Sequence, residues 1–261
     1  MKNPEAVEMV LKTDLKSLRL PTMLREYPSC NREAVEKNNS YIEFLATLTA
    51  IEVKERAIKR INRRISEAHF PVLKTIDTFD MEKAPGLNRH LLMDLTDGHY
   101  VANCENIIFV GKSGTGKTHL ATALGIEACR QNYRVRFYTA CKLVTELLEA
   151  RDDYRLKQFM ERLKRFDILV LDELGYVPFV KAGAELLFQV LADRHEFRST
   201  IITTNLPFQK WVDVFGDAVL TAALLDRITH HCSIFECNWQ SFRFQESSLK
   251  RKKQTGEKNL S

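Results

Sequence analysis

Eight consecutive residues of the chain have the types and spacing of a phosphate-binding loop. They match the pattern G-x-x-x-x-G-K-[ST] at every fixed position and are Gly111, Lys112, Ser113, Gly114, Thr115, Gly116, Lys117 and Thr118. Glycines let backbone N–H groups turn inward around a polyphosphate, and a helix that begins there adds the positive end of its dipole. We expect Lys117 to reach the terminal phosphates and the Thr118 hydroxyl to ligate Mg²⁺. The pattern therefore predicts a nucleoside triphosphate as the ligand.

Two adjacent acids follow a second apolar strand, which is predicted at residues 167–171. Asp172 is expected to lie across from Thr118 and to hold Mg²⁺. Glu173 suits a general base that orients and deprotonates an attacking water, so it indicates hydrolysis. Two acids can also end a strand at the surface, but these follow the loop by about 55 residues, which leaves room for one intervening strand.

Asn205 ends a β-branched strand predicted at residues 200–204. Its amide would lie between the water and the γ-phosphate and would sense which nucleotide is bound. The alternative is a simple cap of the turn before Pro207, but the position at a strand end favours the catalytic role.

One arginine is expected to act on a neighbouring subunit. Arg227 closes the last long predicted helix, and an arginine there commonly reaches the neighbour's site as an arginine finger. An ion pair with a nearby acid is the alternative, and Arg194 and Arg198 are rival candidates for the finger.

The apolar runs after residue 104 predict the α/β fold that would bring these residues together. Strands are expected at 106–110, 134–139, 167–171, 200–204 and 233–237, and helices at about 117–131, 140–150, 156–165, 182–197 and 218–230. This alternation is typical of a mostly parallel five-stranded sheet with helices on both faces. Residues 105–245 are therefore assigned to one nucleotide-binding domain.

Residues 1–70 are expected to form a small all-helical domain that binds DNA. Residues 40–68 have an apolar stripe at helical spacing, with a capping box of Ser40 and Glu43 at the start. Shorter helices are expected around 5–18 and 30–38. Residues 71–104 are broken by Pro and Gly and are interpreted as a linker that could wrap around the next domain.

Basic side chains lie off this apolar stripe and form a candidate DNA-binding surface. They are Lys54, Arg56, Lys59, Arg60, Arg63 and Arg64. A solvated helix face is the alternative, but a basic helical module beside a nucleotide-binding domain favours contact with DNA phosphates. The chain has no evident base-reading motif, so we expect double-stranded DNA to be bound largely independently of sequence.

The basic excess lies at the two ends of the 261-residue chain, whose formal net charge is +5. Residues 1–70 contain 13 Lys and Arg and 10 Asp and Glu. The corresponding numbers are 20 and 22 in residues 71–242, and 6 and 2 in residues 243–261. Residues 246–261 are predicted to be a basic disordered tail, in which Lys250, Arg251, Lys252 and Lys253 would add phosphate contacts.

Other classes of protein fit the composition poorly. No apolar run approaches the roughly 18–20 residues of a membrane span, and the N-terminus lacks a secretory signal, so we expect a cytoplasmic protein without a membrane partner. The six cysteines show no CxxC spacing and are expected to be free thiols. His230, His231 and Cys232 are adjacent, but no second cluster completes a metal site.

Together these residues resemble the AAA+ ATPases of the helicase-loader group, and within it the IstB-type ATP-binding proteins of insertion sequences. The resemblance covers nearly the whole chain and rests on GKSGTGKTHLATALG at 111–125, LDELGYVPF at 171–179, LLFQVLADRHEFRSTIITTN at 186–205 and ALLDRITHH at 223–231. The family tends to end in a Gly-x-Ser-Tyr-Arg-like segment. This chain instead has Trp239-Gln240-Ser241-Phe242-Arg243, so a role of Arg243 stays open.

The resemblance implies an ATPase that binds ATP and Mg²⁺, assembles into a homo-oligomer on DNA and hands target DNA to the transposase of the same element. Relatives of DnaC type load a replicative helicase instead, with a similar ATPase and a different N-terminal domain. A nucleotide-gated DNA-binding module with negligible turnover is the third interpretation.

Overall fold

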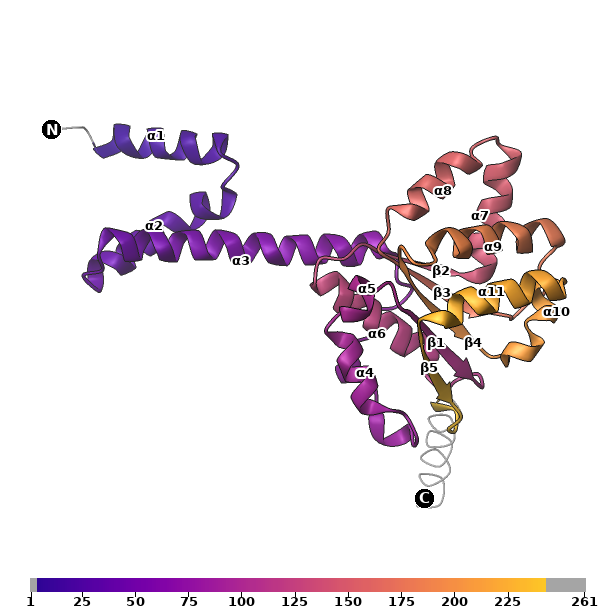
Figure 1. The fold of residues 1–261 in the computed structure, drawn as a ribbon. Coiled ribbons are helices and arrows are strands. Elements are labelled where there is room, and N and C mark those ends of the chain that lie inside the picture. Colours follow the sequence, from indigo (N-terminus) through magenta and orange to yellow (C-terminus); the bar gives the residue numbers. More distant parts are fainter. Residues whose placement is uncertain (1–3, 243–261) are drawn as a thin grey trace, which may run out of the picture. The chain divides into compact units, whose positions relative to one another are not determined.

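The computed structural model describes residues 4–242, and the chain divides into two compact units between Arg63 and Arg64 (Figure 1). The boundary thus lies a few residues before the end of the predicted 1–70 domain. Residues 243–261, which include Arg243 and the predicted basic tail, lie outside the described residues.

The first unit is helical, as the sequence predicted. It contains α1 (Pro4–Ser17), α2 (Pro21–Glu36) and most of α3 (Tyr41–Ala68). The second helix begins earlier than expected, because Pro21 occupies its first turn, where a missing N–H costs nothing. A small core joins the three helices and contains Leu15, Met23, Tyr27, Cys30 and Leu48.

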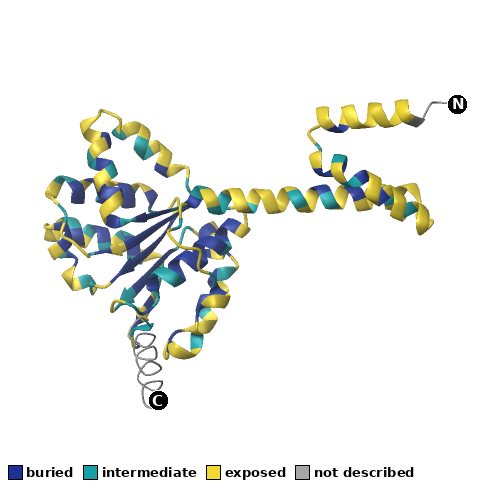
Figure 2. Cartoon of the chain, turned by 180° about the vertical axis from the view of Figure 1, so that it is seen from behind, coloured by how far each residue is buried: buried dark blue, intermediate teal, exposed yellow. Residues whose placement is uncertain are grey.

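The long helix α3 begins at the predicted capping box. The Glu43 carboxylate accepts the backbone N–H of Ser40 at 2.7 Å, and the Ser40 hydroxyl accepts the N–H of Glu43 at 3.3 Å. The predicted apolar stripe is only partly buried, since Leu48 lies in the core whereas Tyr41 and Leu45 are exposed (Figure 2).

The second unit is built on a parallel five-stranded sheet in the order β2-β3-β4-β1-β5, which confirms the predicted fold class. The strands are β1 (Asn106–Gly111), β2 (Val135–Thr139), β3 (Ile168–Leu174), β4 (Ser199–Thr204) and β5 (Cys232–Cys237). Each begins or ends within a few residues of its predicted bounds, because a strand buried on both faces is a short continuous apolar run.

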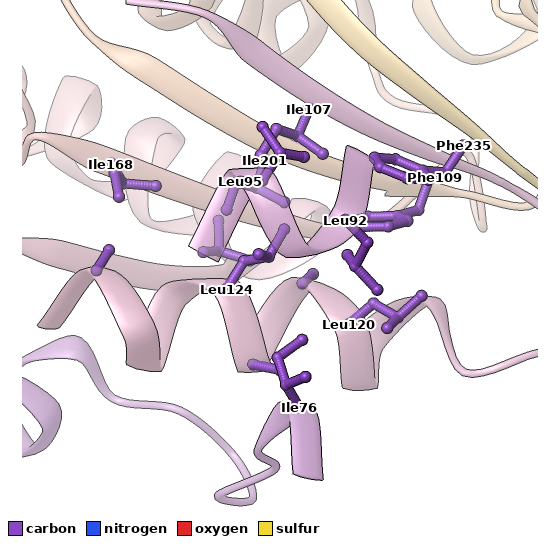
Figure 3. Packing of buried hydrophobic residues seen from close by; sticks show 14 of the residues in the cluster. Ile76, Leu92, Leu95, Ile107, Phe109, Leu120, Leu124, Ile168, Ile201 and Phe235 are labelled. Atoms are coloured by element: carbon purple, nitrogen blue, oxygen red, sulfur yellow. The ribbon is translucent and has the colours of Figure 1, made fainter. Parts of the chain in front are cut away.

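Helices cover both faces of this sheet (Figure 1). They are α6 (Lys117–Arg130), α7 (Ala140–Asp152), α8 (Leu156–Lys164), α9 (Lys181–Arg194), α10 (Val212–Phe215) and α11 (Ala218–His230), with the short 3₁₀ helix η3 (Phe208–Lys210) before α10. Alternate residues of β1 serve two separate cores. Ile107 and Phe109 pack in the core under α6 (Figure 3). Ile108 packs in the core under α7, α9 and α11.

The structure corrects the interpretation of residues 71–104 as a linker. They form η1 (Ile76–Thr78), η2 (Met81–Lys83), α4 (Arg89–Thr96) and α5 (His99–Ala102). Leu92 and Leu95 of this segment are buried in the same core as α6 (Figure 3), and Tyr100 belongs to that core too. The Pro and Gly residues that suggested a linker separate short helices of the α/β unit instead.

Candidate nucleotide-binding site

A cavity of about 530 Å³ opens at the carboxyl ends of β1, β3 and β4, beside the predicted phosphate loop. Parallel α/β sheets bind ligands at this edge, because loops and helix N-termini converge there. The loop itself, the segment 71–83, the β3 and β4 ends and Phe242 form the walls.

Two glycines of the loop have no space for a side chain. A Cβ at Gly111 would lie 2.2 Å from the carbonyl oxygen of Cys237 in β5. Gly116 precedes α6 with a left-handed φ of 89°, and its Cβ would lie 2.7 Å from the Phe79 ring. The fixed glycines of the pattern therefore serve close packing as well as the turn.

Lys117 is the first residue of α6 and is largely buried. Its Nζ donates to the carbonyl oxygens of Gly111 and Lys112, each at 2.8 Å. The ammonium group is thus held against the loop, next to the space where terminal phosphates would lie.

Thr118 and Asp172 come together from opposite sides of the sheet edge. The Thr118 hydroxyl lies 2.9 Å from Oδ1 and 3.1 Å from Oδ2 of Asp172, which is itself buried. A hydroxyl and a carboxylate are the oxygen donors that Mg²⁺ takes in phosphate sites, so this pair fits that ion. These two residues would hold Mg²⁺ against the terminal phosphates.

Glu173 and Asn205 line the same cavity as the loop. Glu173 has a left-handed φ of 59°, its side chain is exposed, and it lines the cavity. Asn205 directly follows β4 and lines the same wall. Much of the predicted loop, together with Glu173 and Asn205, therefore lines one cavity, and Asp172 is joined to it through its contact with Thr118.

The segment 71–83 forms a wall that the sequence analysis missed. Nε2 of His119 lies 2.9 Å from the carbonyl oxygen of Thr75, and since a carbonyl can only accept, Nε2 carries the proton. The same ring meets Phe79 edge-on, with the centroids 5.2 Å apart. Burial lowers the pKa of His119, which keeps the ring neutral at pH 7. Because residues 71–104 were interpreted as a linker, Phe79 was not predicted to line the cavity.

The end of β5 and the residues after it also support the phosphate loop. The Trp239 indole N–H donates to the carbonyl oxygen of Thr115 at 2.9 Å, and the Phe242 N–H donates to that of Gly114 at 2.8 Å. Sequence reasoning missed this contact, because its only signal was a tryptophan with a polar N–H close to the family's closing segment.

The three candidate fingers lie outside the cavity, and the structure separates their roles. Arg227 on α11 is half-buried, with its guanidinium 5.2 Å from the centre of the Phe188 ring. Arg198 is exposed and lies 3.9 Å from the Asp167 carboxylate.

Arg194 is buried, with 2% of its surface exposed. It donates to the carbonyl oxygens of Phe166, at 3.1 Å, and of Ser199, at 2.7 Å. Burial lowers its pKa to about 9. These bonds make Arg194 a structural residue, which corrects its place among the candidates for the finger.

The candidate DNA-binding side chains of α3 differ in their partners. Arg56 pairs with the buried Glu52 at 2.7 Å and also donates to the carbonyl oxygen of Arg19. Three more of the set, Lys54, Arg60 and Arg63, are exposed. The remaining two lie near acids of the same helix, Lys59 near Glu55 and Arg64 near Glu67. Arg64 belongs to the α/β unit.

Within residues 4–242, no three His, Cys, Asp or Glu side chains are arranged to hold a metal ion, so His230, His231 and Cys232 form no such site. All six cysteines are free thiols, as expected. No helix in the described part of the chain is long and apolar enough to cross a membrane.

The parallel sheet, the glycine loop between β1 and α6 and the acid at the end of β3 define a P-loop nucleotide-binding domain. Solved structures of similar fold include the DnaC helicase loader, with a TM-score of 0.50 and 22% identity over 56% of this chain and 86% of that one. Another is the replication initiator DnaA bound to AMPPCP and single-stranded DNA, with a TM-score of 0.54 and 22% identity over 70% and 56% of the two chains. At these identities the likeness shows the fold alone.

The chain belongs to the family described as IstB-like ATP binding protein, whose sequence model matches residues 13–250. It is 36% identical over 237 residues to a protein of Geobacillus stearothermophilus named for insertion sequence IS5376 and for ATP binding, covering 91% of this chain and 94% of that one. A protein of Pseudomonas aeruginosa named for IS21 and ATP binding is 34% identical over 236 residues, covering 90% and 89%.

Proposed function

We propose that this protein is an ATP-hydrolysing helper of an insertion sequence, which assembles on target DNA and recruits the transposase. One observation carries the hydrolytic part: Thr118 and Asp172 meet at the phosphate loop, and Glu173 lies directly beside them on the cavity wall. A site that only bound nucleotide would have no need for this second carboxylate.

Each residue of the cavity then has a role. Lys117 would leave the loop carbonyls and bind the terminal phosphates, and Thr118 with Asp172 would hold Mg²⁺, which supplies charge neutralisation when bound. Glu173 would accept a proton from the attacking water, and Asn205 would orient that water and contact the γ-phosphate. His119 and Phe79 would border the nucleoside end.

Arg227 is proposed to act on the nucleotide of a neighbouring copy of the chain. It lies outside the cavity of its own subunit, on the helix that precedes β5. Its stacking on Phe188 would hold the long side chain in one direction while its charge stays available. This assignment makes hydrolysis depend on a homo-oligomer.

DNA contact is proposed for the six basic residues of the α3 set, through phosphates rather than base edges. Lys54 and Arg60 would contribute more than Arg56, because Arg56 is already paired with Glu52. The names of the relatives connect the family with insertion sequences, which supports a transposase of the same element as the protein partner.

A helicase-loading role is less well supported. The likeness to DnaC is one of fold, whereas the insertion-sequence relatives are more than 30% identical over about nine tenths of the chain. A DNA-binding module with negligible turnover would need neither Glu173 at the cavity nor a finger.

The test combines turnover with capture of the partner. Purified protein is assayed for ATP hydrolysis with and without double-stranded DNA, beside Glu173→Gln. It is then used to capture either the transposase of its own element or a replicative helicase. We expect DNA-stimulated hydrolysis in the wild type alone, and capture of the transposase. Equal turnover in both proteins would reject the site, and capture of the helicase alone would reject the transposition role.

A further inference from the structure

We infer that Thr203 is a positioning residue that sets the geometry of both acids of the ATPase site. The inference rests on the proposed function and adds to it a residue that neither the loop pattern nor the acid pair contains. Thr203 lies on β4, two residues before Asn205, and is 1% exposed. Its position in a central strand would ordinarily be filled by an apolar side chain, so its hydroxyl requires an explanation.

The pairing of β3 with β4 gives the first part of that explanation. The register shifts between Leu171 and Leu174, so that two residues of β3, Asp172 and Glu173, lie opposite Thr203 alone. This is a β-bulge, a feature that bends a strand and redirects a side chain. Without it, two consecutive side chains of β3 would point to opposite faces of the sheet. With it, both acids reach the sheet edge beside the cavity.

The Thr203 hydroxyl contacts both acids at the bulge. It donates to Oδ1 of Asp172, and it accepts the backbone N–H of Glu173 at 3.0 Å. A hydroxyl has one proton and two lone pairs, so the donor is fully used and the orientation of the group is fixed. Asp172 thus receives one hydroxyl from Thr118 and a second from Thr203.

The bond to Glu173 stabilises an uncommon backbone conformation. Glu173 has a φ of 59°, in the left-handed region that residues with a side chain seldom adopt. Such a conformation persists where neighbouring groups hold it in place. The Thr203 oxygen holds the Glu173 amide, and the Glu173 side chain consequently lines the cavity.

Thr203 borders the cavity, but only 1% of its surface is exposed and its hydroxyl is bonded to the two acids, so we place its action on the acids and not on the nucleotide. Its removal should turn the Asp172 carboxylate and release the Glu173 backbone, while the phosphate loop on β1 and α6 keeps its own contacts. The predicted result is weaker Mg²⁺ binding in the nucleotide complex and slower turnover, with little change in metal-free nucleotide binding. Mutation of a residue that hydrogen-bonds a metal ligand typically lowers metal affinity or activity by about 10- to 100-fold.

The test uses the full chain and three variants. Thr203→Val keeps the shape and removes the hydroxyl, Thr203→Ser keeps the hydroxyl, and Thr221→Val is the matched control. Thr221 is also buried, and its hydroxyl donates to the carbonyl oxygen of Asp217, away from the cavity. Binding of a fluorescent ATP analogue is measured in EDTA and then with increasing Mg²⁺, and ATP hydrolysis is measured separately.

We expect Thr203→Val to raise the Mg²⁺ requirement and to lower kcat, each by about 10- to 100-fold, and to bind the analogue normally in EDTA. Thr203→Ser and Thr221→Val should stay close to the wild type. Unchanged Mg²⁺ dependence in Thr203→Val would overturn the inference. So would an equal loss of metal-free binding, because the hydroxyl would then merely support the fold. If the wild type itself fails to hydrolyse ATP, the proposed function fails, while the Mg²⁺ titration still decides the role of Thr203.

Discussion

The phosphate loop and the N-terminal helical unit differ in how many contacts with the rest of the chain support them. Around the loop, the carbonyl oxygens of Gly114 and Thr115 accept hydrogen bonds from the chain after β5, and Gly111 packs on the β5 backbone. The helical unit has a small core and exposes many large apolar side chains (Figure 2), namely Val7, Met9, Val10, Leu11, Leu18, Val35, Tyr41, Ile42, Leu45, Val53 and Ile58.

The difference shows which part of the chain has its geometry fixed within one subunit. A nucleotide site has to place charged groups within a few tenths of an ångström, so supporting contacts on several sides are required. The helical unit, with its small core, has far fewer such supporting contacts. We therefore expect changes at the loop to act on chemistry, and changes in the helical unit to act on stability and assembly.

The largest effect is expected from Lys117→Ala, since the other lysine of the loop, Lys112, is exposed and does not line the cavity. ATP binding, hydrolysis and ATP-dependent assembly should be lost, with the fold intact. Fluorescent-nucleotide binding and light scattering measure these losses, and circular dichroism checks the fold. Lys112→Ala is the matched control, because Lys112 is an exposed residue of the same loop. Wild-type turnover in Lys117→Ala would reject the assignment of the site.

Arg227→Ala should come next. An arginine finger contributes about 10³- to 10⁵-fold to the rate, so hydrolysis should fall within that range while each subunit still binds nucleotide. Arg198→Ala is the control, because Arg198 is exposed and weakly paired. Mixing Arg227→Ala with Lys117→Ala protein should restore some activity. At a mixed interface, the Arg227→Ala subunit supplies an intact nucleotide site and the Lys117→Ala subunit supplies an intact finger. Unchanged turnover in Arg227→Ala alone would leave no activity for the mixture to restore, and it would move the finger elsewhere.

The predicted residues that the structure brings together are those whose partners are close in the chain or fixed by the fold class. The loop needs only a strand before it and a helix after it, and Asp172 meets Thr118 because parallel strands end at one edge. The strands themselves were predictable because each is a continuous apolar run in a sheet buried on both faces.

The residues that the sequence did not locate depend on distant contacts. Trp239 meets a loop residue 124 positions earlier, and His119 meets Thr75 from 44 positions away. Arg194 looked like a candidate for catalysis because an arginine near a strand is ambiguous until its burial is known. Thr203 was simply one member of a β-branched run, and only the bulge opposite it reveals its contacts with both acids.

A moderate effect, confined to the helical unit, is expected from Glu52→Gln. Burial alone would raise the pKa of Glu52, but the Met23 N–H at 2.8 Å and the Arg56 guanidinium outweigh it and hold the pKa below its ordinary value. Stability from this group is therefore present above the unfolded pKa of about 4.3, and it is lost as the pH falls through the lower folded value.

The variant should lose about 1–2 kcal/mol of local stability at pH 7 and should lack that acid-dependent loss. Hydrogen exchange of peptides from residues 4–63, measured in the full chain at pH 7 and at acidic pH, reports the local stability and its pH dependence. Nucleotide binding should not change. Glu55→Gln, which removes the weaker pair with Lys59 at 3.6 Å, is the control. Equal protection of Glu52→Gln and wild type at pH 7 would show that this buried carboxylate contributes nothing to the unit.

The smallest effect is expected from replacing Arg56, Arg60 and Arg63 by Ala. Affinity should weaken similarly on unrelated DNA sequences, because phosphate contacts carry no sequence information. The slope of log affinity against log salt should fall by about 0.9 for each contact removed. The pairing of Arg56 with Glu52 suggests that its share is smaller than that of Arg60.

Salt titrations on two unrelated duplexes, with and without ATP, measure the slope. ATP should strengthen binding of the wild type by joining many weak surfaces along one duplex, and this gain should be smaller in the triple variant. The control is a triple replacement of Lys12, Lys16 and Arg25 by Ala, which removes the same charge from α1 and α2. It distinguishes the loss of DNA contacts on α3 from an effect of the net charge. If both triple variants flatten the slope equally, the effect is one of net charge. If neither does, α3 is not the DNA-binding surface, and its exposed face is left for the transposase or for another copy of the chain.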